Sequence, residues 1–182
     1  MTQEDKQLLL QDLYARLPYR LKGKCEIDAS YDTSFDTVFQ LHKFDAVLEG
    51  IKGGLLFVTP LIEDKDEQEF ANEEVADGID ILDFKPYLRP LSSMTEEEAI
   101  DIAILHGYNP IEILSTKVTD EYIDIILDNC NSCTITSTIW YDGIISSLEC
   151  FDYLNKKMFD FRGLIDKNLA IEVTENNNPY KD

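Results

Sequence analysis

The sequence has few basic residues and lacks any apolar run near the length, about 20 residues, that crossing a bilayer requires. Sixteen lysines and arginines stand against 36 aspartates and glutamates, giving a formal net charge of -20. Because like charges repel, this balance argues against DNA, RNA and anionic membranes as partners. The N-terminus also lacks the apolar core and cleavage site of a secretory signal. We therefore expect a cytoplasmic protein that binds neither nucleic acid nor membrane.

The chain is equally poor in the residues that enzymes and metal sites use. It has two histidines and none of the G-x-S-x-G, Walker A, G-x-G-x-x-G or H-E-x-x-H motifs. Carboxylates are abundant, but no pair of them is singled out, so a carboxylate-dependent enzyme is only an alternative. We predict a non-enzymatic protein without catalytic residues or a cofactor.

Cysteine is also scarce, with four residues that we expect to be reduced thiols in a chain without an export signal. Cys130 and Cys133 have the spacing of zinc ligands and of thiol redox motifs, but no second close pair completes a zinc site. A redox motif would lie at a helix N-terminus, whereas a strand is expected to follow here. We interpret the segment as a turn, with Cys130 and Cys133 as candidate metal ligands.

The composition that remains is sufficient for a folded core. The chain has 182 residues, of which 44% are hydrophobic, and it needs no disulfide or metal to fold. Thr2 and Asp5 have the spacing of a capping box, and apolar residues then recur at helical spacing up to Pro18. From Tyr19 the period changes to two, which predicts a half-buried strand with Cys25 on its inner face.

Further short strands are expected in the N-terminal half. The alternation in residues 37–50 changes parity at His42 and Lys43, which predicts a bulge or turn there and places His42 at a rim. Gly53 and Gly54 lie between two apolar runs and predict a hairpin turn. Such closely spaced strands after one helix favour a small antiparallel β-barrel of SH3-like size.

Residues 63–80 interrupt these strands with nine carboxylates and one lysine. Asp64 and Asp66 have the spacing that opens an EF-hand loop, but Glu69 stands where glycine is needed and Val75 where the closing glutamate is needed. We interpret the segment as an exposed acidic loop, with a recognition loop for a basic partner as the alternative. The candidate contact residues in it are Asp64, Asp66, Glu67, Glu73 and Glu74.

A proline-containing segment, residues 86–94, marks a joint between two halves, because proline favours extended backbone in the residue before it. Thr95 and Glu98 then form a second capping box, opening a helix that ends near His106. Two segments rich in β-branched residues, 121–128 and 134–140, predict a hairpin.

The chain is predicted to end with a helix from Ser146, a strand over residues 169–173 and a polar tail that frays into solvent. The predicted fold is therefore α+β. Residues 1–90 form a helix plus a small SH3-like antiparallel β-barrel, and residues 91–182 form a smaller mixed α/β half. The two halves are separate or pack as one unit.

Three blocks of the sequence resemble a known group of proteins. The blocks are EDKQLLLQDLYARLPY near the start, KPYLRPLSSMTEEE in the middle and LNKKMFDFRGLIDKNLAIEV near the end. In this order they are similar to small acidic proteins of Bacteroides-type gut bacteria, their phages and mobile elements. No activity is assigned to that group. The resemblance therefore implies a context, phage or mobile DNA in a bacterial cell, and it transfers no catalytic residue.

The matching blocks contain four residues that we name as candidate contacts for a partner: Tyr87, Arg89, Phe161 and Arg162. A structural role is the alternative, in which Arg162 satisfies a carboxylate or helix-end carbonyls and Tyr87 packs at the joint.

The resemblance and the charge together favour one functional hypothesis. We expect a non-enzymatic accessory protein that binds a host protein with a basic surface, because acidic mimics of this kind are favoured by charge complementarity. The alternatives are a small-ligand or metal-binding module and a carboxylate-dependent enzyme.

Overall fold

The structure, a computed structural model, describes residues 1–32, 37–119, 121–129, 133–140, 143 and 147–181. The chain has the predicted α+β fold and divides into two compact units. The first unit contains Met1–Leu88 and Arg162–Asp182, and the second contains Arg89–Phe161. The sequence placed the division at residue 90 and assigned all later residues to the second half. In the structure, the last segment of the chain belongs to the first unit.

The first unit begins with the predicted N-terminal helix, α1 (Gln3–Arg16). Thr2 accepts a hydrogen bond from the backbone N–H of Asp5, and the Asp5 carboxylate accepts one from Thr2 N–H, which completes the predicted capping box. Leu9 and Leu13 are buried on one side of the helix. A short 3-10 helix, Leu17–Tyr19, follows at Pro18. The local sequence signals therefore set both ends of α1.

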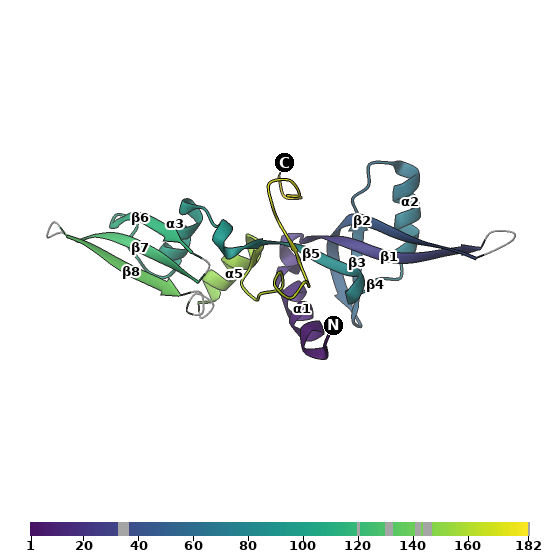
Figure 1. Ribbon diagram of the computed structural model, residues 1–182, viewed down its shortest axis with the longest axis horizontal. Coiled ribbons are helices and arrows are strands. Elements are labelled where there is room, and N and C mark those ends of the chain that lie inside the picture. The colour runs from purple at the N-terminus through teal and green to yellow at the C-terminus, as the bar shows by residue number, and fades with distance from the viewer. Residues whose placement is uncertain (33–36, 120, 130–132, 141–142, 144–146, 182) are drawn as a thin grey trace. The chain divides into compact units, whose positions relative to one another are not determined.

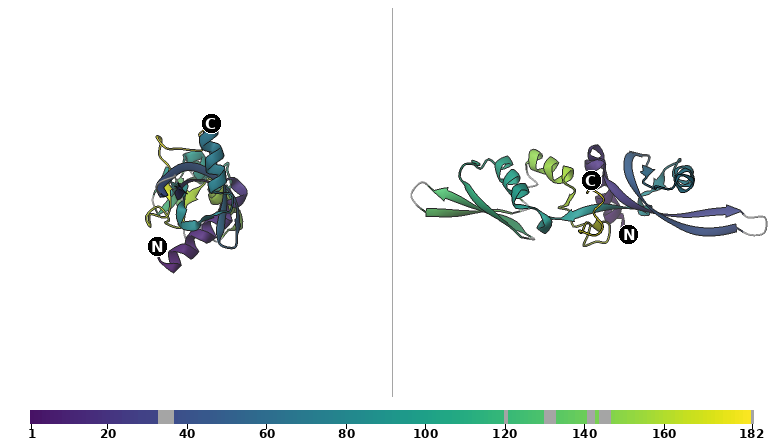
Figure 2. Two further views of the ribbon diagram at one scale, coloured as in Figure 1. Left: turned by 90° about the vertical axis from the view of Figure 1, so that its right-hand side faces the viewer. Right: turned by 90° about the horizontal axis from the view of Figure 1, so that it is seen from above.

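A curled sheet forms the body of this unit (Figure 1). Its strand order is β10-β5-β1-β2-β3-β4, and the neighbouring pairs in this order are antiparallel except β10 with β5. The end of β5, Arg89 and Pro90, also pairs parallel with β9 (Phe159–Asp160). Beyond the other strands, β1 and β2 continue as a two-stranded ribbon (Figures 1 and 2). The strands are β1 (Lys22–Asp32), β2 (Thr37–Lys52), β3 (Leu55–Pro60), β4 (Ile79–Asp80), β5 (Phe84–Pro90) and β10 (Ile171–Glu172).

The hairpin between β2 and β3 confirms the predicted glycine turn. Gly53 and Gly54 have φ values of 63° and 87°, and these positive values are the ones that a tight turn between antiparallel strands requires. Cys25 lies on the buried face of β1, as its alternation predicted.

The predicted irregularity at His42 and Lys43 is wrong. β1 and β2 pair without interruption through these residues, and the register shift lies between Leu48 and Gly50. The change of parity has another cause, since Leu41 is 49% exposed and is not a core residue.

The acidic segment is a helix and not a loop, which corrects the prediction. α2 spans Lys65–Glu74, and Asp64 caps it by accepting the backbone N–H groups of Asp66 and Glu67, each at 3.0 Å. Ala71 and Val75 are buried at helical spacing. One cap and a few apolar positions therefore suffice to fix a helix among nine carboxylates.

The second unit contains a three-stranded antiparallel sheet of order β6-β7-β8. The β7–β8 hairpin confirms the prediction from β-branched residues, and Thr95 and Glu98 form the predicted capping box of α3. A core cluster that includes Ile102, Ile123 and Leu154 joins the helices to the sheet. The elements are α3 (Glu96–Leu105), β6 (Ile113–Val118), β7 (Tyr122–Asn129), β8 (Cys133–Trp140), α5 (Leu148–Lys156) and β9 (Phe159–Asp160).

The start of α5 and the C-terminal tail differ from the predictions. Ser147 caps α5, one residue after the predicted start, and Ser146 lies outside the described residues. The polar tail does not fray into solvent as predicted. Lys22 N–H donates to the Tyr180 hydroxyl at 3.1 Å, and the Lys22 ammonium donates to the Pro179 carbonyl at 2.6 Å. The tail is therefore attached to the start of β1.

Candidate functional site

A groove lies in the first unit between α2 and the β1–β2 hairpin, and its volume is about 660 Å³. This volume is in the range of small-ligand and side-chain pockets. Its floor is mainly apolar and comes from three parts of the chain that are distant in sequence. The apolar lining residues are Ile27, Leu41, Phe44, Ile62, Phe70 and Ala71, and the polar ones are His42, Lys43, Asp66 and Glu67.

His42 is the most unusual side chain in the groove. Its ring lies 4.9 Å from the ring of Phe70, at an interplanar angle of 42°. Its Nε2 atom is buried, and it has no hydrogen-bond partner within the described part of the chain. A buried polar nitrogen without a partner is unfavourable, so this side chain carries a cost in stability.

The rim of the groove is acidic. Asp66 and Glu67 lie in the first turn of α2, where their charge is favoured by the helix dipole, and both are exposed. Lys43 is the single basic lining residue, and its ammonium group is already bound to the Glu26 carboxylate at 3.0 Å. The rim therefore offers negative charge to a partner.

The rest of α2 extends this acidic surface. Glu73 and Glu74 are exposed near its C-terminal end, and Asp64 is its N-cap. Among the residues with described side chains, none forms an ion pair with a carboxylate of α2. All five acidic candidates from the sequence therefore lie on or next to one helix, and two of them line the groove.

The other four candidate contact residues are largely used within their own units. Tyr87 is buried, and its hydroxyl donates to the Asp45 carboxylate at 2.7 Å; burial, followed by that hydrogen bond, raises the Tyr87 pKa above its ordinary value. Arg162 donates to the buried Asp12 carboxylate at 2.7 Å. In the second unit, Arg89 makes two hydrogen bonds to Glu98, and Phe161 packs edge-on against Phe151. These contacts leave little of the four side chains for a partner.

The cysteines do not form a site in the described structure. Cys130 lies outside the described residues, and only the backbone of Cys133 is described. Burial raises the pKa of the Cys25 thiol to about 12, and burial also raises that of Cys150. Both thiols are therefore poor nucleophiles at neutral pH. The described side chains contain no group of three or more His, Cys, Asp or Glu residues that could hold a metal ion.

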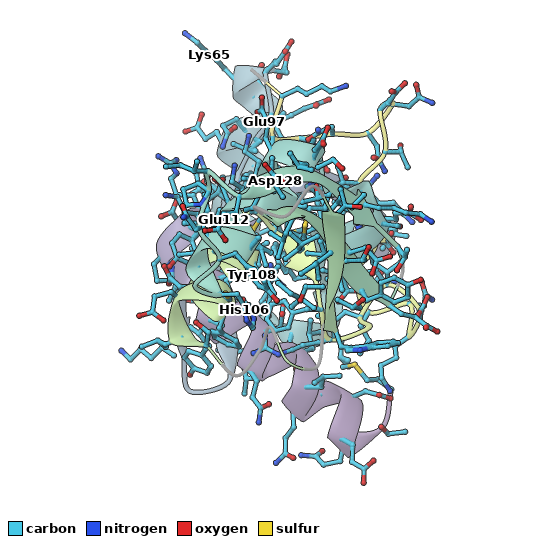
Figure 3. The ribbon with its side chains drawn as sticks, turned by 90° about the vertical axis from the view of Figure 1, so that its left-hand side faces the viewer. Lys65, Glu97, His106, Tyr108, Glu112 and Asp128 are labelled. Atoms are coloured by element: carbon cyan, nitrogen blue, oxygen red, sulfur yellow. The ribbon has the colours of Figure 1, made fainter. Side chains whose placement is uncertain are left out.

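Acidic side chains also occur in the second unit, where Glu97, Glu112 and Asp128 are exposed (Figure 3). They come from α3, from the segment before β6 and from β7. The groove beside α2 differs from these exposed carboxylates because acidic and apolar side chains line the same concave surface.

Comparison of the chain with protein-family models, curated proteins and solved structures finds no match. In the described chain, no helix combines the length and the apolar character that crossing a membrane would require.

Sequence reasoning identified the rim of the groove and missed its floor. Asp66 and Glu67 were named because the acid run is visible in the sequence. His42 was placed at a rim but not proposed as a contact, and Phe44 and Phe70 were not proposed either, because nothing local indicates that α2 lies over the β1–β2 hairpin. The recognisable signal was Phe70 followed by Ala71 and Val75, which gives a charged segment an apolar side.

Proposed function

We propose that the protein is a non-enzymatic accessory protein of phage or mobile-element origin that binds a host protein with a basic surface. The contact surface in this proposal is the exposed acidic side of α2 with the groove beside it. The observation that carries the proposal is a groove that combines an apolar floor with the carboxylates of Asp66 and Glu67, while its lysine, Lys43, is paired with Glu26.

The chemistry of the groove defines the partner. Lysine or arginine side chains would pair with Asp66 and Glu67, while an apolar side chain between them would fill the floor formed by Phe44 and Phe70. The net charge of -20 would speed association with a basic surface. Because much of this attraction is between exposed charges, it should weaken as salt is added.

The test is recovery of a partner from the lysate of a Bacteroides-type bacterium with the full chain as bait. Washing at roughly 0.05 M and roughly 0.3 M salt changes the Debye length from about 14 Å to about 6 Å. We expect a basic protein at the lower salt that is lost at the higher one. A partner that survives the high-salt wash would contradict the proposal.

A matched pair of variants then locates the surface. With the purified partner, Asp66→Asn combined with Glu67→Gln should raise the Kd about tenfold, equivalent to about 1.4 kcal/mol. The control is Asp166→Asn combined with Glu175→Gln, which removes the same charge from exposed positions of the same unit that do not line the groove. Equal effects of the two pairs would mean that only net charge matters.

The volume and the apolar floor of the groove favour a second candidate, a module that binds a small ligand there. A compound with an aromatic ring and an amine would match the apolar floor and the acidic rim. A panel of aromatic amines should contain compounds that raise the Tm, because binding to the folded state stabilises it. The rise should be lost in Phe70→Ala. A panel without effect would leave no support for this candidate.

Two finer points belong to the same proposal. We assign the curled sheet to the SH3-like barrels, supported by the helix followed by antiparallel strands with a two-glycine hairpin. We assign the protein to the cytoplasm, supported by the free, buried thiols of Cys25 and Cys150.

A further inference from the structure

One edge of the sheet in the second unit is chemically unprotected. β8 pairs with β7 on one side, and the described residues provide no strand for its other side. Its eight residues, CTITSTIW, contain no charged residue, proline or glycine, and its register with β7 is unbroken from Trp140 to Cys133. Natural edge strands are usually blocked by charges, prolines or bulges, because free N–H and C=O groups recruit another strand. β8 has none of these features.

The two faces of β8 have different chemistry. Ile139, Ser137 and Ile135 lie opposite Ile123, Ile125 and Leu127 of β7, so they share the face that holds the core. The other face of β8 presents threonines and Trp140. Two apolar side chains of this strand are nevertheless exposed, with Ile135 at 48% and Trp140 at 55%. An added strand would cover them.

We propose that β8 pairs antiparallel with β8 of a second copy of this chain, around a two-fold axis at Ser137. Residues that face each other across such a pair must lie on the same side of the sheet, which restricts the possible registers. With the axis at Ser137, Ile135 lies opposite Ile139 of the second copy on the core face. Thr136 lies opposite Thr138, and Thr134 lies opposite Trp140, on the other face.

The pairs made by this register are favourable ones. Aliphatic, threonine and aromatic to β-branched pairs all stabilise antiparallel strands. The residue on the axis is small, and its hydroxyl already shares a hydrogen bond with the hydroxyl of Tyr108, a residue labelled in Figure 3. The strand is therefore complementary to itself, which is what a two-fold interface requires. An unrelated partner would not need this symmetry.

Charge determines how such a dimer responds to salt. β8 contains no charged residue, so no charges meet where the two strands pair. Two chains of charge -20 nevertheless repel each other at longer distance. Added salt screens that repulsion, so the dimer should become tighter as salt increases. This response is opposite to that of the groove, so the two surfaces can be tested separately on the same protein.

The test is sedimentation velocity of the full chain between about 1 and 200 µM, since dimerisation follows mass action. At roughly 0.05 M and roughly 0.5 M sodium chloride we expect a concentration-dependent dimer, with a Kd several-fold lower at the higher salt. Trp140 is the single tryptophan, so its fluorescence should change over the same concentration range. Hydrogen exchange should show that the β8 amides that do not bond to β7 gain protection in the dimer.

Two variants separate the interface from general effects. Ile135→Lys places a charge against the second copy and should give a monomer, with the Tm showing that the chain still folds. Ile111→Lys is the control, because Ile111 is 88% exposed and lies outside β8. It should dimerise like the unmodified chain.

Three results would overturn the proposal. One is a chain that stays monomeric at about 200 µM in high salt. Another is a dimer in which the β8 amides exchange as fast as in the monomer, since the contact would then lie elsewhere. The third is added protection of the outer β8 amides only after a different protein is added, which would assign this edge to that partner.

Discussion

Asp12 is a fully buried carboxylate that binds two arginines of the first unit. Its Oδ2 accepts from Arg16 Nε at 2.7 Å, and its Oδ1 accepts from Arg16 Nη2 at 3.0 Å and from Arg162 Nη1 at 2.7 Å. Arg16 is also fully buried. The cluster connects α1 to the C-terminal segment. The carboxylate of Asp12 offsets the cost of burying the guanidinium group of Arg16.

Removing the carboxylate should therefore be costly. Asp12→Ala removes the carboxylate that binds two guanidinium groups, one of them fully buried, and we expect the free energy of unfolding to fall by about 3–5 kcal/mol in urea denaturation. Asp166→Ala, an exposed aspartate of the same unit, should change it by less than about 0.5 kcal/mol. A loss below about 1 kcal/mol for Asp12→Ala would mean that the pair adds little to stability.

The protonation of Glu98 should change the stability of the second unit as the pH falls. Burial alone would raise its pKa, but hydrogen bonds from Arg89 and from Thr95 N–H, with the charges of Arg89 and Lys157, outweigh burial and lower the pKa. A carboxyl group with a lowered pKa in the folded state stabilises the fold above its unfolded pKa, about 4.3 for glutamate. That contribution is lost as the pH falls through the lower, folded value.

Glu98→Gln should accordingly be less stable than the unmodified chain at pH 7. In urea titrations, the difference should shrink as the pH falls below about 4, because both chains then carry an uncharged group. Glu97→Gln, at an exposed position on the same helix, should show a small difference at every pH. A pH-independent difference for Glu98→Gln would show that shape, and not charge, matters at this position.

At the scale of the elements, β1 depends on the close approach of β5. A Cβ atom on Gly23 would lie 2.7 Å from the Lys85 carbonyl oxygen and against the Phe84 ring. Because the carbonyl is backbone, the strands would have to separate, and Gly23→Ala should cost about 1–3 kcal/mol in urea denaturation. Gly50→Ala is the control, since the nearest atom to its added methyl is Phe57 Cβ at 3.9 Å. Equal stability of the two variants would refute this account of the strand contact.

Elements with a local sequence signal could be predicted, and contacts between distant segments could not. The capping boxes at Thr2 and Thr95 and the turn at Gly53 were predicted correctly because each signal lies within four residues. α2 was missed because only Phe70, Ala71 and Val75 show its apolar side. The docked tail depends on Tyr180 reaching Lys22, a contact 158 residues apart in the chain that no local pattern contains. The floor of the groove was missed for the same reason.

At the scale of the whole molecule, the charge of -20 opposes folding, because bringing like charges together costs free energy. Screening should reduce this cost. The Tm should therefore rise by about 2–4 °C for each kcal/mol of repulsion that salt removes. The measurement is a thermal scan from roughly 0.01 M to roughly 0.3 M sodium chloride, which shortens the Debye length from about 30 Å to about 6 Å.

The acidic side of α2 should account for part of this salt response. Neutralising Asp66, Glu67, Glu73 and Glu74 removes four charges from one exposed helix, so the variant should have a smaller rise in Tm over the same range. An unchanged slope would place the repulsion elsewhere on the molecule. A smaller slope together with loss of partner binding would show that the same carboxylates oppose folding and attract the basic partner. The charges of this helix would then serve binding at a cost in stability.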